Sequence, residues 1–280
     1  MNVEVEEVRF PSGELELYGR LRTPADDAPT IILLCGIGFH TFEYEPLATW
    51  LAAGGVNCLS FDYRGHGRSG GARGSWTLPE LVTDTRRAID LVRRNHPGPI
   101  DLFGNSLGAM VGILAGAEDH RVRSVVASNC PARIADFLLT RPRRMLFAIA
   151  KAAAFFVPLR FSVNHFYSYD QLIADQSWIS TIEHDALIAS ARRLSVPTYR
   201  TLLEYWDGAA AVTALHKPLL LIQGRNDQLQ PPRQSQLLYD AANDPREYLL
   251  LDTGHLPHLE DTGTVGGVLV DWFARTARSP

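Results

Sequence analysis

The stretch Gly104-Asn105-Ser106-Leu107-Gly108 decides the fold that we predict for this chain. It follows residues 100–103, a mainly apolar run typical of a strand, and opens residues 106–117, whose small and apolar side chains are typical of a helix. A serine at a tight strand-to-helix turn needs neighbours without Cβ atoms, because the turn crowds them. Backbone N–H groups at the start of the helix would then face a negative charge that forms near Ser106. The stretch therefore predicts an accessible, reactive serine, and an ordinary glycine-rich turn is the alternative.

Outward from this turn, the sequence alternates between apolar runs and segments with helical spacing. Residues 3–10 and 14–22 alternate polar and apolar side chains around Ser12-Gly13, which predicts an N-terminal hairpin. The expected buried strands are residues 31–34, 56–61, 100–103, 122–128, 219–223 and 247–251. The expected helices are residues 46–53, 77–94, 106–117, 232–242 and 265–274. This alternation predicts an α/β fold in which a mostly parallel central sheet carries helices on both faces.

The alternation is interrupted between residues 131 and 212, where the sequence has helical patterns but no convincing buried strand. We therefore expect residues 1–130 and 213–280 to form an α/β core, and residues 131–212 to form an inserted helical cap, or lid. Ligands bind at the carboxyl ends of the strands in open α/β sheets, so the cap is expected to cover that edge.

A serine nucleophile needs a base, and the base needs an acid that orients it. Asp227 lies in the loop after the strand at residues 219–223, and His255 lies in the loop after the strand at residues 247–251. Both loops would open on the same edge of the sheet as Ser106, so we predict a catalytic triad of Ser106, Asp227 and His255. The alternatives are Asp252 and Asp136 for the acid, His258 for the base, and a turn-forming role for Asp227.

The loop after the strand at residues 31–34 reads Cys35-Gly36-Ile37-Gly38-Phe39-His40. A tetrahedral oxyanion needs preorganised backbone N–H donors, and we expect them from Leu107, directly after the nucleophile, and from Ile37 in this loop. The glycines could instead begin a dinucleotide-binding loop, but Thr41 stands where the third glycine should be. No lysine of a phosphate-binding loop follows, and we expect no cofactor.

Two further groups of polar residues have simpler explanations. His255 and His258 could form a pair of metal ligands, but no third ligand is placed to complete the site, so no metal is expected. The loop from Asp62 to Gly70 contains Arg64 and His66, which could act on a substrate. We favour a structural role for this loop, held by hydrogen bonds from Asp62 and Arg64, because a complete triad exists without it.

Composition excludes several classes of protein. The chain has 280 residues, is 46% hydrophobic and carries a formal net charge of −4, which fits a globular α/β protein and gives no basic stripe for nucleic acid. Its three cysteines, Cys35, Cys58 and Cys130, follow no metal or disulfide spacing and are expected to be buried free thiols. Residues 1–10 lack the apolar core of a signal peptide, and the apolar stretch 145–161 is interrupted and too short to cross a bilayer. We expect a cytoplasmic protein without an integral membrane segment.

Taken together in chain order, the motifs resemble the α/β-hydrolase superfamily. They are Cys35-Gly-Ile-Gly, Asp62-x-Arg-Gly-His-Gly-x-Ser69, Gly104-Asn-Ser-Leu-Gly108, Gly224-x-x-Asp227-x-x-x-Pro231 and Gly254-His255. The resemblance spans roughly residues 29–280 apart from the cap, and it implies the α/β-hydrolase fold. It also implies Ser106 as nucleophile, His255 as base and Asp227 as acid, with Ile37 and Leu107 as oxyanion donors. Most members carry a histidine where this chain has Cys35, which bears on the shape of the oxyanion loop and not on the triad.

Two narrower resemblances concern the substrate. Residues 36–48 and 129–137 are similar to the fatty-acyl thioesterases that supply bacterial luminescence. The Gly-Asn-Ser elbow also resembles that of carbon–carbon hydrolases of aromatic ring-fission products. Those enzymes usually carry Pro-Gly-Phe or Pro-Gly-Trp where this chain has Arg64-Gly65-His66, which counts against them.

The predicted function is therefore that of a serine hydrolase that cleaves an ester or thioester of an apolar acyl group through an acyl-enzyme. The alternatives are a carbon–carbon hydrolase, a non-hydrolytic cyclase or acyltransferase with the same triad, and a binding module without turnover. The substrate is expected to be a small-molecule acyl ester or thioester held under the cap. The cap residues expected to contact the acyl group are Phe137, Leu138, Phe147, Phe155 and Phe156.

Basic residues gather in the first part of the predicted cap. They are Arg133, Arg141, Arg143, Arg144, Lys151 and Arg160, against the single acid Asp136. Such a face would attract a coenzyme A thioester or an acyl carrier protein. The alternative is a solvated surface whose arginines pair with acids elsewhere, such as Asp170, Asp175 or Glu183.

Overall fold

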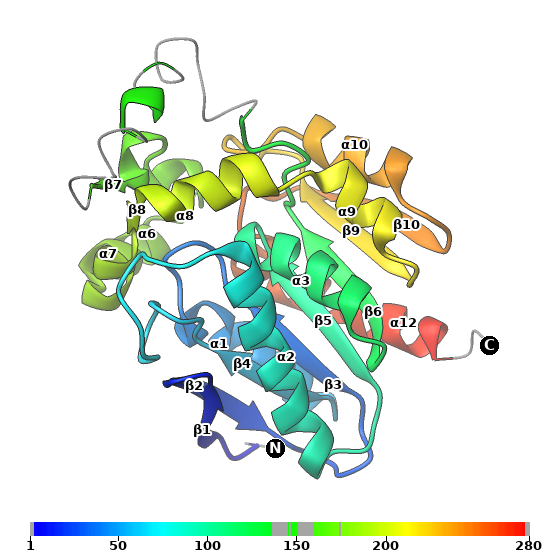
Figure 1. Cartoon of the computed structure of the whole chain (residues 1–280). Coiled ribbons are helices and arrows are strands. Elements are labelled where there is room, and N and C mark those ends of the chain that lie inside the picture. Colours follow the sequence, from blue (N-terminus) through cyan, green and yellow to red (C-terminus); the bar gives the residue numbers. More distant parts are fainter. Residues whose placement is uncertain (1–2, 136–144, 146, 151–158, 174, 278–280) are drawn as a thin grey trace.

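One sheet forms the centre of the computed structural model, which describes residues 3–135, 145, 147–150, 159–173 and 175–277 (Figure 1). Its strands lie in the order β1-β2-β4-β3-β5-β6-β9-β10. Their bounds are β1 (Glu6–Ser12), β2 (Leu15–Arg22), β3 (Thr30–Leu34), β4 (Asn57–Phe61), β5 (Ile100–Asn105), β6 (Val122–Ser128), β9 (Leu219–Gly224) and β10 (Arg246–Leu251). All pairs from β4 to β10 are parallel, and β2 pairs antiparallel with both β1 and β4. The mostly parallel sheet predicted from the sequence is confirmed.

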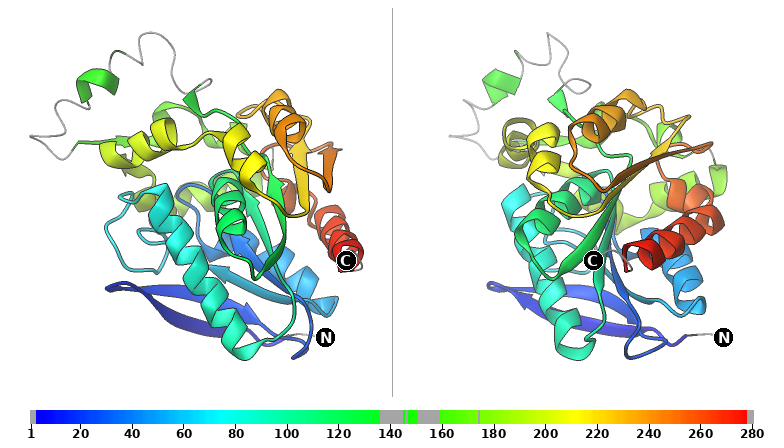
Figure 2. Two further views of the ribbon diagram at one scale, coloured as in Figure 1. Left: turned by 45° about the vertical axis from the view of Figure 1, so that its right-hand side comes forward. Right: turned by 90° about the vertical axis from the view of Figure 1, so that its right-hand side faces the viewer.

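Helices cover both faces of this sheet, as Figure 2 shows. One face carries α2 (Leu78–Asn95), α3 (Leu107–Glu118), α9 (Gly208–Ala214) and α10 (Arg233–Ala241), and the other carries α1 (Glu45–Ala53), α11 (Pro257–Glu260) and α12 (Thr262–Thr276). Every residue of β3, β4 and β5 is buried, which explains why these strands read as continuous runs. Two separate apolar clusters, one for each face, form the core.

Helix α2 begins at a capping box formed by Thr77 and Glu80. The Glu80 carboxylate accepts a hydrogen bond from the Thr77 N–H (2.8 Å), and Pro79 stands in the first turn. Leu81, Ala88 and Val92, spaced along one face, are buried against the sheet. The cap residues thus set where the helix begins, and the apolar face sets how it lies on the sheet.

The region predicted as a cap contributes short helices and a second, two-stranded sheet. Its elements are β7 (Arg160–Ser162), η2 (Val163–His165), η3 (Tyr169–Gln171), α6 (Gln176–His184), α7 (Ala186–Ala191), β8 (Arg193–Ser195), α8 (Val196–Arg200) and the π-helical turn η4 (Thr201–Tyr205). We did not expect β7 and β8, because strands of three residues carry too little alternation to be recognised in a sequence. The predicted boundary at residue 212 falls inside α9, which packs on α3 and α10. The division into core and cap stays a prediction.

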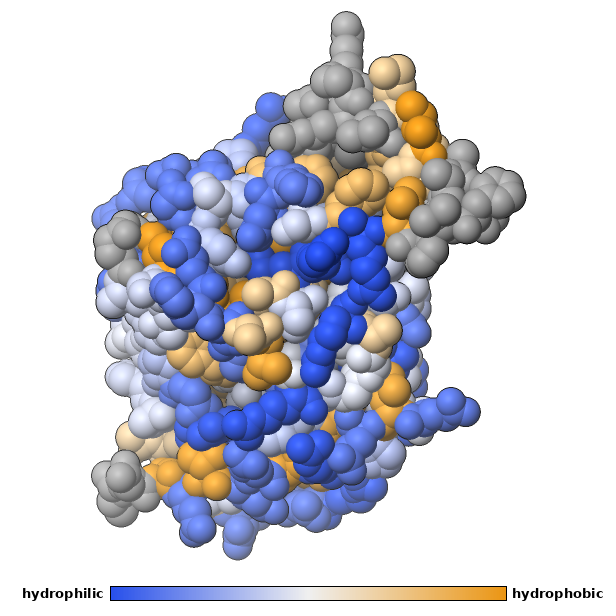
Figure 3. Space-filling view, turned by 90° about the vertical axis from the view of Figure 1, so that its left-hand side faces the viewer, coloured by the Kyte–Doolittle hydropathy of each residue, from blue (hydrophilic) through white to orange (hydrophobic). Residues whose placement is uncertain are grey.

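The surface on the side of α6, α7 and β7 is mostly hydrophilic, but hydrophobic residues gather beside the residues drawn in grey (Figure 3). Met145 and Ile149 are 68% and 59% exposed, the highest values for large hydrophobic side chains in the described ranges. Among the described helices, none combines the length and the apolar character needed to cross a membrane.

Helix α3 approaches the sheet so closely that position 108, in its first turn, has room only for glycine. A Cβ atom on Gly108 would lie 1.8 Å from the carbonyl oxygen of Leu34 in β3. A Cβ atom on Gly104, near the end of β5, would lie 2.2 Å from the carbonyl group of Gly108. These obstacles are backbone atoms, so they cannot turn aside as a flexible side chain would. The crossing from β5 into α3 therefore requires both glycines.

Replacing Gly108 by alanine should lower the free energy of unfolding by about 2 kcal/mol or more, because the sheet and the helix must separate to admit the methyl group. Gly112→Ala, one turn further along α3, is the matched control. Its Cβ atom would meet a side-chain carbon of Leu34 at 3.3 Å, so its effect should stay within about 1 kcal/mol. Denaturant unfolding measures both variants, and equal losses would contradict this account of the elbow.

Candidate active site

Ser106 forms the turn between β5 and α3 and has the backbone angles φ 54° and ψ −111°. A positive φ is strained for a residue with a Cβ atom and costs about 1–3 kcal/mol. The Ser106 N–H donates to the carbonyl oxygen of Ser128 (2.9 Å), which ties the turn to the end of β6. Ser106 is half-buried, whereas Asn105 and Leu107 on either side are fully buried. The strained turn thus leaves the serine accessible.

His255 and Asp227 lie in contact in the loops after the neighbouring strands β10 and β9. The His255 Nδ1 atom is 2.8 Å from Asp227 Oδ2, and both side chains are buried. Ser106 and His255 line the same small cavity, together with Ile37 of the oxyanion loop, although no hydrogen bond joins the serine hydroxyl to the imidazole. The structure therefore brings the three residues of the predicted triad to one place at the carboxyl edge of the sheet.

The Asp227 carboxylate is surrounded by hydrogen-bond donors. Its Oδ1 atom accepts from the backbone N–H groups of Leu229 and Gln230, both at 2.8 Å, and its Oδ2 atom accepts from the Asn129 side-chain amide at 2.6 Å. Burial by itself raises the pKa of Asp227. The charge and hydrogen bond of His255, together with the Gln230 N–H and the Asn129 amide, lower the pKa by more than burial raises it, so the net pKa lies below its ordinary value. Asp227 is thus held ionised and fixed in orientation.

The alternative acids do not share this position. Asp252 is exposed and pairs with Arg225 at 2.7 Å, outside the contact with His255. Asp136 lies outside the described residues. Of the carboxylates that the structure describes, Asp227 is the one hydrogen-bonded to the His255 ring.

The alternative base, His258, is fully buried in the short helix α11. Its Nε2 atom is 3.1 Å from Glu43 Oε1, an ion-pair distance without the alignment of a hydrogen bond, and both side chains are fully buried. Its ring packs against Tyr44, with 4.8 Å between ring centroids. These contacts give His258 a structural position beneath the site and leave His255 as the histidine that faces Ser106.

Of the two predicted oxyanion donors, Ile37 lines the small cavity and Leu107 directly follows Ser106. Leu107 is the first residue of α3, and Ile37 lies in a turn closed by a hydrogen bond from the Phe39 N–H to the Gly36 carbonyl (3.2 Å). Neither the Leu107 nor the Ile37 N–H has an acceptor among the described residues, so both are free for a ligand oxygen. The Gly36 N–H donates to the buried Glu43 carboxylate (3.0 Å), which fixes the loop from below. Their role as donors stays a prediction.

Cys35, which stands where most superfamily members have a histidine, is inert packing. Its thiol is buried, and burial raises its pKa well above the usual value. Cys58 and Cys130 are also buried and free, as expected.

Several residues that position the triad were not recognised in the sequence. Asn129, after β6, has φ 46°, and its side-chain amide bridges Asp227 and the Gly254 carbonyl. The Asn105 side chain donates to the His255 carbonyl oxygen (3.0 Å). The one available signal was that each asparagine stands at a strand end on the same edge as Ser106, and asparagine tolerates a positive φ better than most residues.

The loop from Asp62 to Gly70 has the structural role that we favoured. The Asp62 carboxylate accepts from the Thr41 and Arg68 N–H groups, both at 2.7 Å. The Arg64 guanidinium binds the buried Asp84 carboxylate at 2.7 Å. His66 is buried, and burial lowers its pKa to about 4, so it is neutral near pH 7.

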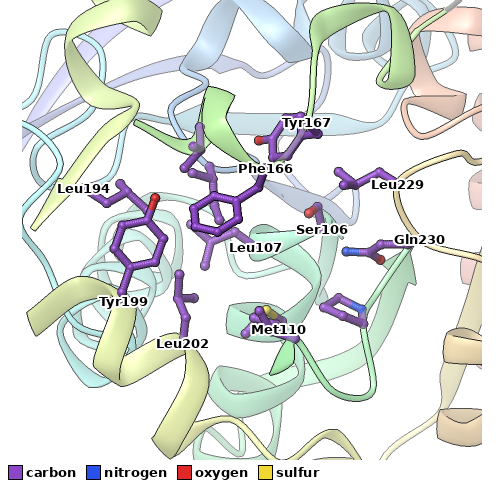
Figure 4. A pocket seen from close by; sticks show the side chains of 14 residues that line it. Ser106, Leu107, Met110, Phe166, Tyr167, Leu194, Tyr199, Leu202, Leu229 and Gln230 are labelled. Atoms are coloured by element: carbon purple, nitrogen blue, oxygen red, sulfur yellow. The ribbon is translucent and has the colours of Figure 1, made fainter. Parts of the chain in front are cut away.

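A second, larger cavity opens directly beside Ser106 (Figure 4). Its lining residues are Ile37, Ser106, Leu107, Met110, Pro131, Ile134, Val163, Phe166, Tyr167, Leu194, Tyr199, Leu202, Leu229 and Gln230. Eight of them come from the predicted cap region and most are apolar or aromatic, which is typical of a site for an apolar ligand. In the described ranges, no cluster of three His, Cys, Asp or Glu side chains is placed to hold a metal ion.

Most of the residues predicted to contact the acyl group lie outside the described part of the chain. Phe137, Leu138, Phe155 and Phe156 lie outside the described residues, as do Arg141, Arg143, Arg144 and Lys151 of the basic group. Phe147 packs half-buried against the core cluster and is not among the residues that line the cavity. Apart from Ile37, Ser106 and Leu107, the cavity wall comes from residues that sequence reasoning missed, because α8 and the segment after β7 show no pattern that points toward Ser106.

The fold and this site define an α/β hydrolase, and the comparisons with known proteins agree. Residues 26–260 match the family described as serine aminopeptidase, S33, and the chain belongs to this family of hydrolases. The chain is 29% identical over 225 residues to a protein of Mycolicibacterium smegmatis named monoacylglycerol lipase, covering 78% of this chain and 77% of the relative. It is 25% identical over 277 residues to a Stachybotrys chlorohalonatus protein named polyketide transferase ATR5, covering 90% of each. Among solved structures, the α/β hydrolase GrgF from a Penicillium species superposes with a TM-score of 0.79 at 22% identity, covering 98% of this chain and 99% of the other.

The two histidines should respond differently to substitution. His255→Ala should lower kcat by at least about 10³-fold, with little change in stability, because the imidazole is the group that reaches Ser106. His258→Ala leaves the buried Glu43 carboxylate without its partner and should cost about 3 kcal/mol of folding free energy. Activity per folded molecule and thermal unfolding measure the two effects. A stable but inactive His258→Ala variant, beside an active His255→Ala variant, would reverse the assignment.

The lowered pKa of Asp227 predicts a pH-dependent contribution to stability. The folded-state pKa lies below the unfolded value of about 3.9, so the contribution is present above that pH and is lost as the pH falls toward the folded-state pKa. Asp227→Asn should remove this acid-side dependence and lower kcat by roughly 10⁴-fold through loss of the correct imidazole tautomer. Thermal unfolding between about pH 3 and 7 tests the first effect. The control Asp252→Asn should leave both properties as they are.

Proposed function

We propose that this hydrolase cleaves carboxylic esters of apolar acyl groups, with Ser106 as nucleophile. The observation that carries the proposal is the position of Ser106: it lies between an apolar cavity and a buried, hydrogen-bonded pair of His255 and Asp227. The His255–Asp227 pair without the cavity would not indicate a substrate class. The apolar cavity without the pair would indicate binding and no reaction.

The chemistry follows from the geometry in four steps. His255 takes the proton from the Ser106 hydroxyl as the oxygen attacks the ester carbonyl, and Asp227 holds the imidazole in the required tautomer. The Leu107 and Ile37 N–H groups stabilise the negative charge on the carbonyl oxygen. The alcohol leaves with the proton from His255, and an acyl-enzyme remains. Water, activated by His255, then releases the acid and restores Ser106.

An ester is favoured over the other bonds by the named relatives. The Mycolicibacterium smegmatis relative is called a monoacylglycerol lipase, and its similarity extends over most of this chain. The wall of the cavity supports an apolar acyl group, since burial of each methylene contributes about 0.8 kcal/mol. Residues 131–212 are proposed to act as the cap that supplies this wall.

Two other acyl reactions use the same machinery. Transfer of the acyl group to an alcohol in place of water is favoured by the relative named as a polyketide transferase. A thioester of an acyl carrier protein remains the second candidate substrate because of the basic residues between 133 and 160. It predicts a strongly salt-dependent kcat/KM for the thioester and a weak salt dependence for a neutral ester.

The proposal predicts that esters of graded acyl length are hydrolysed with kcat/KM rising about fourfold for each added methylene until the cavity is filled. Ser106→Ala should abolish turnover and covalent labelling by a fluorophosphonate while the protein stays folded, because the hydroxyl takes no part in the packing of the core. Ser180→Ala, at an exposed position, is the control. Near-normal hydrolysis by Ser106→Ala would overturn the mechanism, and a flat dependence on chain length would argue for a small-ester enzyme.

A further inference from the structure

Gln230 is an unusual residue in the wall of the cavity beside Ser106. It lies three residues after Asp227, is 2% exposed and lines the same cavity as Ser106, Met110 and Leu229. Figure 4 shows its amide group extending toward the cavity, on the side where Ser106 lies. An uncharged but strongly polar group therefore faces a space that is otherwise almost entirely apolar.

The amide of Gln230 has no hydrogen-bond partner among the described residues. Its Oε1 atom is buried without a hydrogen bond, and its Nε2 atom donates to no acceptor in the part of the chain that the structure describes. Elsewhere in the wall, the Tyr199 hydroxyl donates to the Phe161 carbonyl (3.3 Å), and the Arg192 guanidinium lies over the Tyr167 ring. Gln230 adds an amide with unused hydrogen-bonding capacity to the wall that also contains Ser106.

Hydrogen bonds fix the backbone of Gln230. The Gln230 N–H donates to Asp227 Oδ1 (2.8 Å), and the Gln230 carbonyl accepts from the Gln223 side chain (3.1 Å). Gln223 is in turn held by the Ser235 hydroxyl (2.6 Å). The hydrogen bonds that fix the Asp227 loop thus also fix the base of the Gln230 side chain, and folding does not need its amide group. The amide is therefore unpaired and presented from a backbone that is already fixed, which lowers the cost of ordering it for a ligand.

We propose that the Gln230 amide binds a hydroxyl group of the substrate next to the scissile carbonyl, an inference that rests on the proposed ester hydrolysis. A hydroxyl suits an amide because it can donate to Oε1 or accept from Nε2. Burying an amide without a partner is unfavourable, and a ligand that completes its hydrogen bonds is strongly preferred to one that leaves them unmade. The low polarity of the surrounding wall strengthens the contact. The substrate class is then a hydroxylated ester, with the hydroxyl on either the alcohol or the acyl side of the bond.

Two matched pairs of esters test the inference and locate the hydroxyl. The first compares a 2-hydroxyethyl ester with the propyl ester of the same acid, and the second compares a 3-hydroxyacyl ester with the unsubstituted acyl ester of the same alcohol. The wild-type protein should favour the hydroxylated member of one pair in kcat/KM. Gln230→Met, which keeps the size of the side chain and removes its polarity, should reduce that ratio by about tenfold or more. It should also raise the melting temperature, since the unpaired amide is removed.

Gln228→Met is the matched control, because Gln228 lies in the same loop but is exposed to solvent. It should leave the ratio as in the wild type, and Gln230→Leu serves as a second apolar variant. A ratio that survives both Gln230 substitutions, or a wild-type protein that prefers neither hydroxylated ester, would overturn the inference and leave the ester hydrolase in place. Absence of hydrolysis of all four esters would overturn the proposed function and the inference with it.

Discussion

The close contact of α3 with β3 constrains the position of Ser106 relative to the oxyanion loop. Gly108 meets the carbonyl oxygen of Leu34 with no space for a side chain, so the head of α3 can stand in only one place on the sheet. The loop that begins after β3 carries Ile37, and Ser106 stands directly before α3. The distance between the proposed nucleophile and the oxyanion loop is therefore set by backbone packing, which is much stiffer than any contact between side chains.

A polar network at the carboxyl edge of the sheet fixes the positions of Asp227 and His255, as the backbone packing fixes the position of Ser106. Asn129, at the end of β6, bridges Asp227 after β9 and Gly254 after β10, so three neighbouring strands contribute to one cluster. Its members are buried and largely satisfied, and such networks are rigid because each lost hydrogen bond leaves a costly unpaired group. The strained backbone at Ser106 and at Asn129 persists within this cluster because the surrounding contacts determine both conformations.

The proposed selectivity comes from a different part of the molecule. The described sheet and its helices supply the reactive groups, while the residues after β7 and along α8 supply much of the apolar wall. A fold of this kind hosts many reactions, so the wall and the few polar groups in it decide which substrate is accepted. Gln230 joins the two parts, because it belongs to the acid loop by its backbone and to the cavity by its side chain.

The sequence by itself determined the strands of the central sheet, the main helices, the elbow and the order of Ser106, Asp227 and His255, because these features depend on local spacing and on turns that only certain residues can form. Only the tertiary structure separated His255 from His258. Both follow β10 and lie three residues apart, and they differ in what they contact: Asp227 for His255 and Glu43 for His258. The same holds for Asn129 and for the wall of the cavity. Their partners lie some 100 residues away or in short, irregular segments, and no periodicity along the chain records a contact made across the fold.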